Sequence, residues 1–253
     1  DYDGTLASLK TRPENAKPTP ELIATLQKLV SDPANHVVVN SGRDHFTLEK
    51  WLGNLPIAMA AEHGAFYKEN GIWHKNINKA EWSSGLVSIL KLFVEKTPRS
   101  HLEVKETALA WHYRESDAWL GALRAQQLIN VLVNICILQI IQGDKVVEIK
   151  SPDYNKGSEV RRQLEKKHYD FIIAMGDDTT DEDMFKALPV NAVTIKVGYV
   201  SEAASYNMPS QTEVLPFLQI LANKKDMKQP IGENVKTSLK GVFDFFRDLL
   251  KTK

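Results

Sequence analysis

The chain has 253 residues, enough to bury a core as one large domain or as two smaller ones. Its 32 Lys and Arg residues balance its 32 Asp and Glu residues, which excludes a strong overall field that would attract nucleic acid or an anionic membrane. No apolar run reaches transmembrane length, and a single cysteine, Cys136, excludes a disulfide framework. We therefore expect a cytoplasmic protein whose affinity for any anionic ligand is local.

The chain opens with the sequence DYDGTL, in which Asp1 and Asp3 are two positions apart. If these residues follow a strand, both carboxylates point to one side and can reach a metal ion and a phosphorus atom together. Gly4 then allows the backbone to turn sharply. Taken alone, the pair is interpreted equally well as an acidic turn. The sequence does not contain the apolar strand that would hold Asp1, so we expect this chain to be one module of a longer polypeptide.

Residues 19–64 alternate the patterns of helices and buried strands. Thr19 and Pro20 predict the start of a helix with one apolar face. The apolar runs 36–40 and 57–61 lack alternation and predict strands that are covered on both faces. This order is typical of a parallel sheet, in which ligands bind beyond the carboxyl ends of the strands. Polar segments follow both strands: Ser41-Gly42-Arg43-Asp44 and Glu62-His63-Gly64.

A different pattern occupies residues 66–149. Asn70-Gly71 predicts a hairpin, and alternating apolar residues from 102 to 113 predict antiparallel strands with one exposed face. Helices and a last hairpin complete this segment. We therefore expect residues 66–149 to form an α+β domain inserted into a core that consists of residues 1–65 and 150–223.

The parallel pattern returns after the insertion. Lys156 opens a predicted helix, and residues 171–175 predict a buried strand that leads into the sequence GDDTTD at 176–181. A polar linker and an amphipathic helix are expected in residues 224–253. The predicted fold class is therefore α/β, with a Rossmann-like parallel-sheet core and an inserted α+β domain.

Four polar clusters lie at the predicted edge of the core where ligands bind. They contain Asp1 and Asp3; Ser41; Lys156; and Asp177, Asp178 and Asp181. Cleaving a phosphate ester needs a nucleophile, an acid for the leaving oxygen and positive charge beside the phosphate. A carboxylate nucleophile would pass through an aspartyl-phosphate, and Mg²⁺ favours this chemistry while needing only two or three carboxylate ligands. The four clusters together favour a Mg²⁺-dependent phosphatase.

The same motifs, in the same order, resemble those of the haloacid dehalogenase-like phosphatases. The resemblance implies that Asp1 attacks phosphorus, and that Asp3 protonates the leaving oxygen and later activates water. It also implies that Ser41 and Lys156 hold the phosphoryl oxygens. The implied Mg²⁺ ligands are Asp1, the backbone carbonyl of Asp3 and Asp177, with Asp178 and Asp181 supporting the metal or orienting Lys156. In this superfamily the inserted domain is a cap that recognises the substrate.

Further segments narrow the resemblance to the trehalose-6-phosphate phosphatases. They are Glu62-His63-Gly64, His112-Tyr113-Arg114, the sequence VVEI at 146–149, Asn155-Lys156-Gly157 and the sequence GDDTTDEDMF at 176–185. Members stand alone or are fused behind a trehalose-6-phosphate synthase, so a fused or associated synthase module is an implied partner. Two positions depart from the family pattern: residues 7–9 read ASL instead of Thr-Pro-Ile, and Asn40 replaces an apolar residue.

A disaccharide phosphate needs many polar partners, and the predicted cap offers charged candidates. For Arg114, Lys145 and Glu148 in the cap, the alternative interpretation is an exposed ion pair. His63 is equally well interpreted as a ligand or as a packed hinge residue. The substrate-binding candidates are Arg114, Lys145 and Glu148 in the cap, Glu62 at its hinge, and Gly42 and Arg43 near the phosphate.

Two other functions compete with hydrolysis of trehalose 6-phosphate. The protein could be a phosphatase of another sugar phosphate, because only the cap selects the sugar. It could instead be a non-catalytic module that binds a sugar phosphate and regulates a synthase. Retention of every acid and of Lys156 argues against the second alternative, since binding alone gains nothing from a nucleophile beside a general acid.

Overall fold

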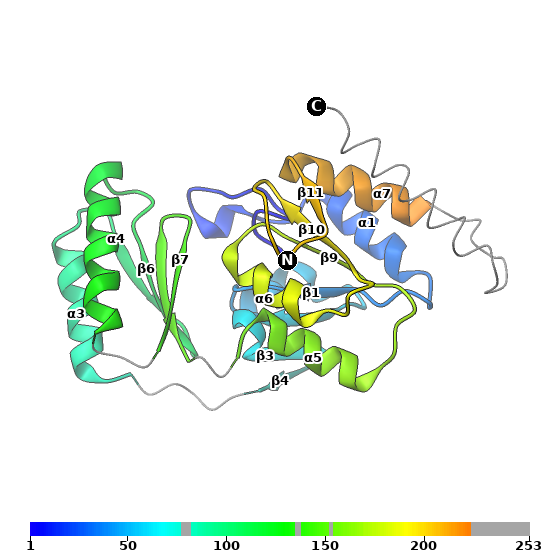
Figure 1. The fold of residues 1–253 in the computed structure, drawn as a ribbon, viewed down its shortest axis with the longest axis horizontal. Helices are drawn as coiled ribbons and strands as arrows, with labels where there is room; N and C mark the ends of the chain where they lie inside the picture. Colours follow the sequence, from blue (N-terminus) through cyan, green and yellow to red (C-terminus); the bar gives the residue numbers. More distant parts are fainter. Residues whose placement is uncertain (77–81, 135–137, 152–153, 224–253) are drawn as a thin grey trace.

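The structure is a computed structural model, and it describes residues 1–76, 82–134, 138–151 and 154–223 (Figure 1). Cys136 and the amphipathic helix expected in 224–253 lie outside these residues. Among the described residues, no helix combines the length and the apolar character that crossing a membrane requires.

The first core sheet has four strands in the order β1-β2-β3-β4. Strand β1 (Val38–Asn40) pairs in parallel with β2 (Ala58–Ala61). Strand β2 then pairs antiparallel with β3 (Phe66–Glu69), which forms a hairpin with β4 (Ile72–Lys75). The hairpin predicted from Asn70-Gly71 is therefore confirmed, and both of its turn residues have the positive φ that such a turn requires.

The hairpin β3–β4 belongs to the core sheet and not to the insertion. Our sequence-based boundary at residue 66 placed it in the inserted domain, because a hairpin signal is local and does not reveal which strand the hairpin joins. Its backbone pairs with β2, from Met59 opposite Lys68 to Ala61 opposite Phe66. The inserted unit therefore starts after β4.

The second core sheet is entirely parallel, with the order β11-β10-β9. It consists of β9 (Ile173–Gly176), β10 (Val193–Val197) and β11 (Tyr206–Met208). Helices flank both core sheets (Figure 1). They are α1 (Pro20–Val30), α2 (His45–Leu52), α5 (Lys156–Lys166), α6 (Thr179–Ala187) and α7 (Val214–Asn223), with short 3-10 turns at Pro13–Asn15, Glu62–Gly64 and Gln211–Glu213. The α/β fold with a parallel core is confirmed.

A cavity of about 350 Å³ lies between the two core sheets. Its lining includes β1 and β9, which are each the terminal strand of their own sheet, together with apolar residues of α1 and α5 such as Leu26 and Val160. Asp1 and Met175 also line this cavity, and the α-amino group of Asp1 donates a hydrogen bond to the carbonyl of Met175 (3.0 Å). The cavity leaves Val38 and Ile173 only half-buried.

The inserted unit has one antiparallel sheet with the strand order β5-β6-β8-β7. Helices α3 (Ser84–Glu95) and α4 (Ala118–Val133) lie together on one side of this sheet (Figure 1). Trp111 of β6 and Leu128 of α4 are fully buried in the core that the sheet and these helices form. The four strands are β5 (His101–Val104), β6 (Ala108–His112), β7 (Gln139–Gly143) and β8 (Val146–Lys150).

Candidate active site

The carboxylate of Asp1 is buried at the carboxyl end of β9. Its Oδ1 accepts a hydrogen bond from Lys156 Nζ (2.8 Å), and its Oδ2 accepts one from the Thr5 hydroxyl (2.9 Å). Gly4 makes this arrangement possible: its φ is +75°, and a Cβ atom there would come within 2.0 Å of the Asp177 carboxylate. The loop therefore brings Asp1 and Asp177 together, as the motifs predicted.

Lys156 lies at the start of α5, where Asn155 caps the helix by accepting a hydrogen bond from Ser158 N. Its ammonium group donates to Asp181 as well as to Asp1, and both distances are 2.8 Å. Burial alone lowers the pKa of Lys156, but the charges of Asp181 and Asp178 outweigh it and raise the pKa. Lys156 is therefore a permanently charged cation between the acids.

Asn40, a departure from the family pattern, has a specific contact. Its side-chain amide donates a hydrogen bond to the backbone carbonyl of Lys156 (3.0 Å). Both residues are buried. Asn40 thus connects β1 to the start of α5.

The acids of the sequence GDDTTD follow β9: Asp177 and Asp178 lie between β9 and α6, and Asp181 lies in the first turn of α6. Asp178 caps α6 and accepts hydrogen bonds from Thr180 N and Asp181 N, while Asp181 accepts one from Asp178 N. Gly176 is required, because a Cβ atom there would come within 2.0 Å of Asp181 Cγ. Burial opposes ionisation of Asp178, yet the charge of Lys156 and the hydrogen bonds from Thr180 and Asp181 lower its pKa.

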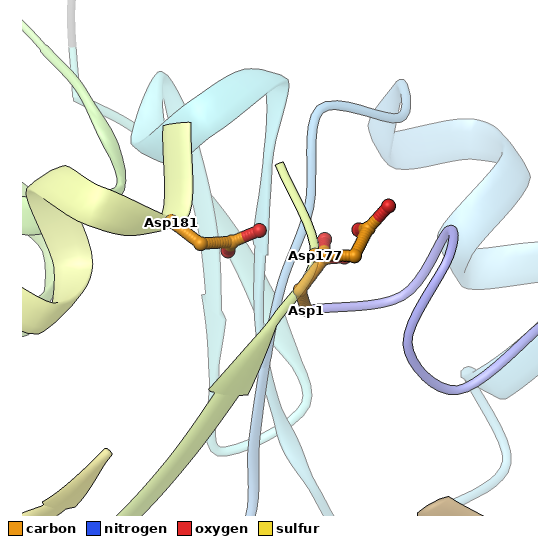
Figure 2. A group of neighbouring side chains, drawn as sticks. All are labelled: Asp1, Asp177 and Asp181. Carbon is orange, nitrogen blue, oxygen red and sulfur yellow. The ribbon is translucent and has the colours of Figure 1, made fainter. Parts of the chain in front are cut away.

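Three carboxylates meet at this edge of the sheet. Oxygen atoms of Asp1, Asp177 and Asp181 lie within 4.8 Å of one another, and Figure 2 shows Asp181 reaching toward the other two from the start of α6. Burial and the charges of Asp178 and Asp181 raise the pKa of Asp177 to about 7. Among the described residues, Asp177 Oδ1 is a buried atom with no hydrogen-bond partner. The group therefore has an excess of negative charge that a cation would relieve.

Ser41 and Arg43 follow β1 in the chain, and Arg43 contacts Asp3. The Ser41 hydroxyl oxygen accepts a hydrogen bond from Arg43 N (3.1 Å). The guanidinium of Arg43 donates two hydrogen bonds to the Asp3 carboxylate, from Nε (2.6 Å) and from an Nη atom (2.5 Å). Sequence reasoning placed Arg43 near the phosphate without identifying Asp3 as its partner.

Glu62 and His63 form a strained turn between the core strands β2 and β3, and this turn contacts the inserted unit. Both have positive φ values, 48° and 58°, which non-glycine residues rarely adopt. Buried Glu62 accepts hydrogen bonds from the backbone N and the hydroxyl of Thr107, and burial raises its pKa. Glu62 therefore fastens the inserted unit to the core.

Glu148 lies at the same junction, inside a charged cluster. Its two carboxylate oxygens contact His63 Nε2 (3.1 Å) and Lys105 Nζ (3.0 Å), and Lys105 also donates to the carbonyl of Gly42 (3.1 Å). Burial opposes ionisation of Glu148, but the charges of Lys105 and His63 outweigh it and lower its pKa. Glu148, His63 and Gly42 are thus brought together.

Sequence reasoning missed Lys105. Glu103 pairs with Ala110, which pairs with Glu148 on the next strand, so these residues share one face of the sheet. Lys105 is two residues beyond Glu103 and belongs to the same face. The alternation around residues 102–105 shows that Glu103 and Lys105 share a face of their strand. The sequence does not show the register that places Glu148 on the same face of the sheet.

Arg114 and Lys145 are not part of this cluster. Arg114 pairs with the side chain and the carbonyl of Asp144 at 2.8 and 2.5 Å, an exposed pair at the tip of the β7–β8 hairpin. Lys145 lies in the turn of that hairpin, with φ 61°. It precedes β8, the strand that contains Glu148.

Comparison with known proteins identifies the family. A sequence model of the family described as trehalose-phosphatase matches residues 1–213. The chain belongs to the trehalose-phosphatase family. The resemblance inferred from the motifs is therefore confirmed.

Relatives within and around the trehalose-phosphatase family are longer than this chain. A Dictyostelium discoideum protein named alpha,alpha-trehalose-phosphate synthase (UDP-forming) B is 42% identical over 233 residues, which cover 88% of this chain and 30% of that protein. A trehalose-phosphatase of Zygosaccharomyces rouxii is 39% identical over 216 residues, which cover 74% of this chain and 24% of that protein. The chain thus spans less than a third of either relative.

A solved structure resembles the trehalose-phosphatase chain over most of its length. The C-terminal domain of the C. albicans trehalose-6-phosphate phosphatase superposes with a TM-score of 0.82 at 32% identity. The match covers 87% of this chain and 89% of that domain. The fold described above is therefore the fold of a known trehalose-6-phosphate phosphatase domain.

Proposed function

We propose that the chain is a phosphatase domain that hydrolyses trehalose 6-phosphate to trehalose and phosphate. The position of Asp1 carries this proposal: its carboxylate is held by Lys156 and Thr5 at the edge of the parallel sheet, beside Asp177. Membership of the trehalose-phosphatase family supports the choice of substrate.

Transfer of the phosphoryl group to Asp1 is the first step of the proposed reaction. A carboxylate oxygen of Asp1 attacks phosphorus, the bond from phosphorus to the sugar oxygen breaks, and Asp3 gives its proton to that oxygen. Lys156 offsets the negative charge of the phosphoryl oxygens. The Ser41 hydroxyl accepts from Arg43 N, so its own proton is available to a phosphoryl oxygen.

Hydrolysis of the aspartyl-phosphate is the second step. Water attacks phosphorus and passes a proton to Asp3, which by then is a carboxylate. The bond from phosphorus to the Asp1 oxygen breaks, and phosphate leaves. Asp3 has 30% of its side chain exposed, compared with 4% for Asp1, which supports its role as the group that exchanges protons with substrate and water.

We propose Mg²⁺ as the cofactor. The ligands we propose are Asp1, Asp177 and the backbone carbonyl of Asp3, with Asp178 and Asp181 in support. The partnerless buried oxygen of Asp177 and its raised pKa support a cation at this position, and oxygen ligands are those that Mg²⁺ prefers. When bound, Mg²⁺ supplies positive charge that offsets the charge of the phosphoryl group.

The sugar-binding residues we propose lie at the junction of core and insertion. Glu148 and Lys105 form an ion pair, and Lys105 also contacts the carbonyl of Gly42, which lies between Ser41 and Arg43. Both side chains can therefore exchange their mutual contact for hydrogen bonds to sugar hydroxyls. Glu62 and His63 border the same junction. The roles of Arg114 and Lys145 as sugar ligands stay predictions.

We propose that the inserted unit after β4 is the cap that selects the substrate. Its buried contacts with the core pass through Thr107 and Glu62, next to the cluster around Glu148. We also propose a synthase segment as a fused or associated partner. The greater length of the synthase relative, of which the match covers 30%, supports this partner.

Phosphate release from a panel of sugar phosphates, with Mg²⁺ and with a chelator, tests the proposed function. We expect release from trehalose 6-phosphate that requires Mg²⁺ and exceeds release from glucose 6-phosphate and sucrose 6-phosphate. Preference for another sugar phosphate would replace the substrate. Binding of trehalose 6-phosphate without any phosphate release would instead favour a regulatory module.

A further inference from the structure

Arg43 connects two residues with different tasks in the proposed reaction. Its guanidinium donates to both carboxylate oxygens of Asp3, at 2.6 and 2.5 Å. Its backbone N donates to the hydroxyl of Ser41 at 3.1 Å. One residue therefore touches both the proton-transferring acid and a group proposed to hold the phosphate.

The Asp3 carboxylate depends on Arg43 for its orientation. Within the part of the chain that the structure describes, Arg43 is the only side chain that hydrogen-bonds this carboxylate. Because the guanidinium is a planar fork, two parallel bonds fix the plane of the carboxyl group as well as its position. A lysine in its place could fix only one contact.

Aromatic rings hold Arg43 itself. The guanidinium carbon lies 4.5 Å from the ring centre of Trp51 and 5.6 Å from that of Tyr2. Tyr2 is fully buried and donates its hydroxyl proton to the carbonyl of Ala16 (2.8 Å). The Arg43 carbonyl also accepts a hydrogen bond from Glu62 N (2.9 Å). Arg43 is thus fixed at both its backbone and its guanidinium end, with only 10% of its side chain exposed.

We propose that Arg43 is a positioning residue that aims the Asp3 carboxyl group at the leaving oxygen of the substrate. The inference rests on the proposed function, in which Asp3 protonates that oxygen. A general acid acts only within hydrogen-bond distance of the atom it protonates, and small displacements cost rate. Arg43 therefore contributes to catalysis through Asp3, without itself contacting the phosphoryl group.

Two esters with different leaving groups separate this role from others. The alkoxide of a sugar is a poor leaving group and needs the proton from Asp3, whereas nitrophenolate leaves without one. With the enzyme in excess, rapid mixing measures how fast the sugar leaves trehalose 6-phosphate and nitrophenol leaves p-nitrophenyl phosphate. Release of the leaving group reports the first step alone, so slow hydrolysis of the aspartyl-phosphate does not affect it.

We expect Arg43→Ala to slow sugar release by at least about 10-fold more than nitrophenol release, given the usual contribution of a general acid. Arg43→Lys should recover only part of the loss. Arg162→Ala is the matched control, because Arg162 of α5 also forms a bidentate pair, with Glu159 at 2.7 Å, and its guanidinium carbon lies 3.6 Å from the ring centre of Tyr67. This variant should leave the ratio of the two rates unchanged.

Equal losses on both esters would overturn the inference, because they would indicate a structural role or direct phosphate binding. A higher KM for both esters and a higher inhibition constant for inorganic phosphate, with unchanged release rates, would also overturn it. If wild-type protein releases sugar from another sugar phosphate only, the proposed substrate fails while the comparison of leaving groups still tests Arg43. If it cleaves no ester at all, the proposed function fails and the inference fails with it.

Discussion

Lys156 Nζ lies 2.8 Å from the carboxylate of Asp1, although the two residues are 155 positions apart in the chain. The same ammonium group lies 2.8 Å from Asp181, so one cation separates the proposed nucleophile from an acid of the neighbouring loop. Lys156 stays charged, and its ammonium group holds the Asp1 carboxylate in position beside Asp181. The pair therefore fixes the position of the proposed nucleophile.

We expect Asp1→Asn to abolish phosphate release while trehalose 6-phosphate still binds. The amide keeps the shape and one hydrogen-bond acceptor for Lys156, but it is not a nucleophile, so the loss should exceed about 1,000-fold, as for other essential groups in catalysis. Phosphate release and isothermal titration of the substrate measure the two effects. Lys68→Met, which removes a buried lysine paired with Glu49 away from the site, is the control for destabilisation. Phosphate release at a tenth of the normal rate would mean that Asp1 is not the nucleophile.

The raised pKa of Asp177 predicts a pH-dependent stability of the metal-free protein. Because the folded-state pKa of about 7 is above the ordinary value of 3.8, folding favours the protonated form. The stability that Asp177 contributes is complete below about pH 4 and is lost as the pH rises to about 7. Thermal unfolding in chelator should therefore show a falling Tm over this range. In Asp177→Asn the Tm should fall less over this pH range. Mg²⁺ should raise the Tm of the wild type most near pH 7.

An unchanged Tm between pH 4 and pH 7 in both proteins would contradict the burial and charge repulsion that raise this pKa. A fall of equal size in Asp177→Asn would assign the pH dependence to other groups. In either case Asp177 would not be the acid whose charge a cation relieves.

The motif residues were predictable because of a simple property of parallel sheets. Ser41 directly follows β1 and Asp177 directly follows β9, and ligands bind beyond the carboxyl ends of parallel strands. Their positions at strand ends were therefore predictable from the order of the elements, whereas the contact of Asp1 with Lys156 was implied by the motifs. Contacts that depend on the direction of a long side chain did not follow in the same way, as Arg43 shows by pairing with Asp3.

The charged residues of the insertion were less predictable because antiparallel register is set by distant partners. Glu148 was identified, whereas Lys105 was missed, although both lie on one face of the sheet. Arg114 was expected at the substrate but pairs with Asp144 at the hairpin tip. Local alternation defines the two faces of each strand, but only the register shows which charges meet.

Glu148→Ala should separate recognition of the sugar from the chemistry at phosphorus. We expect hydrolysis of p-nitrophenyl phosphate to change little and kcat/KM for trehalose 6-phosphate to fall by roughly 30-fold or more, since truncating a buried hydrogen-bonded charge costs about 2 kcal/mol or more. Arg124→Ala removes an exposed hydrogen bond to Gln127 in the same insertion and should leave both activities unchanged. Equal losses on both esters would mean that Glu148 supports the fold of the junction and does not read the sugar.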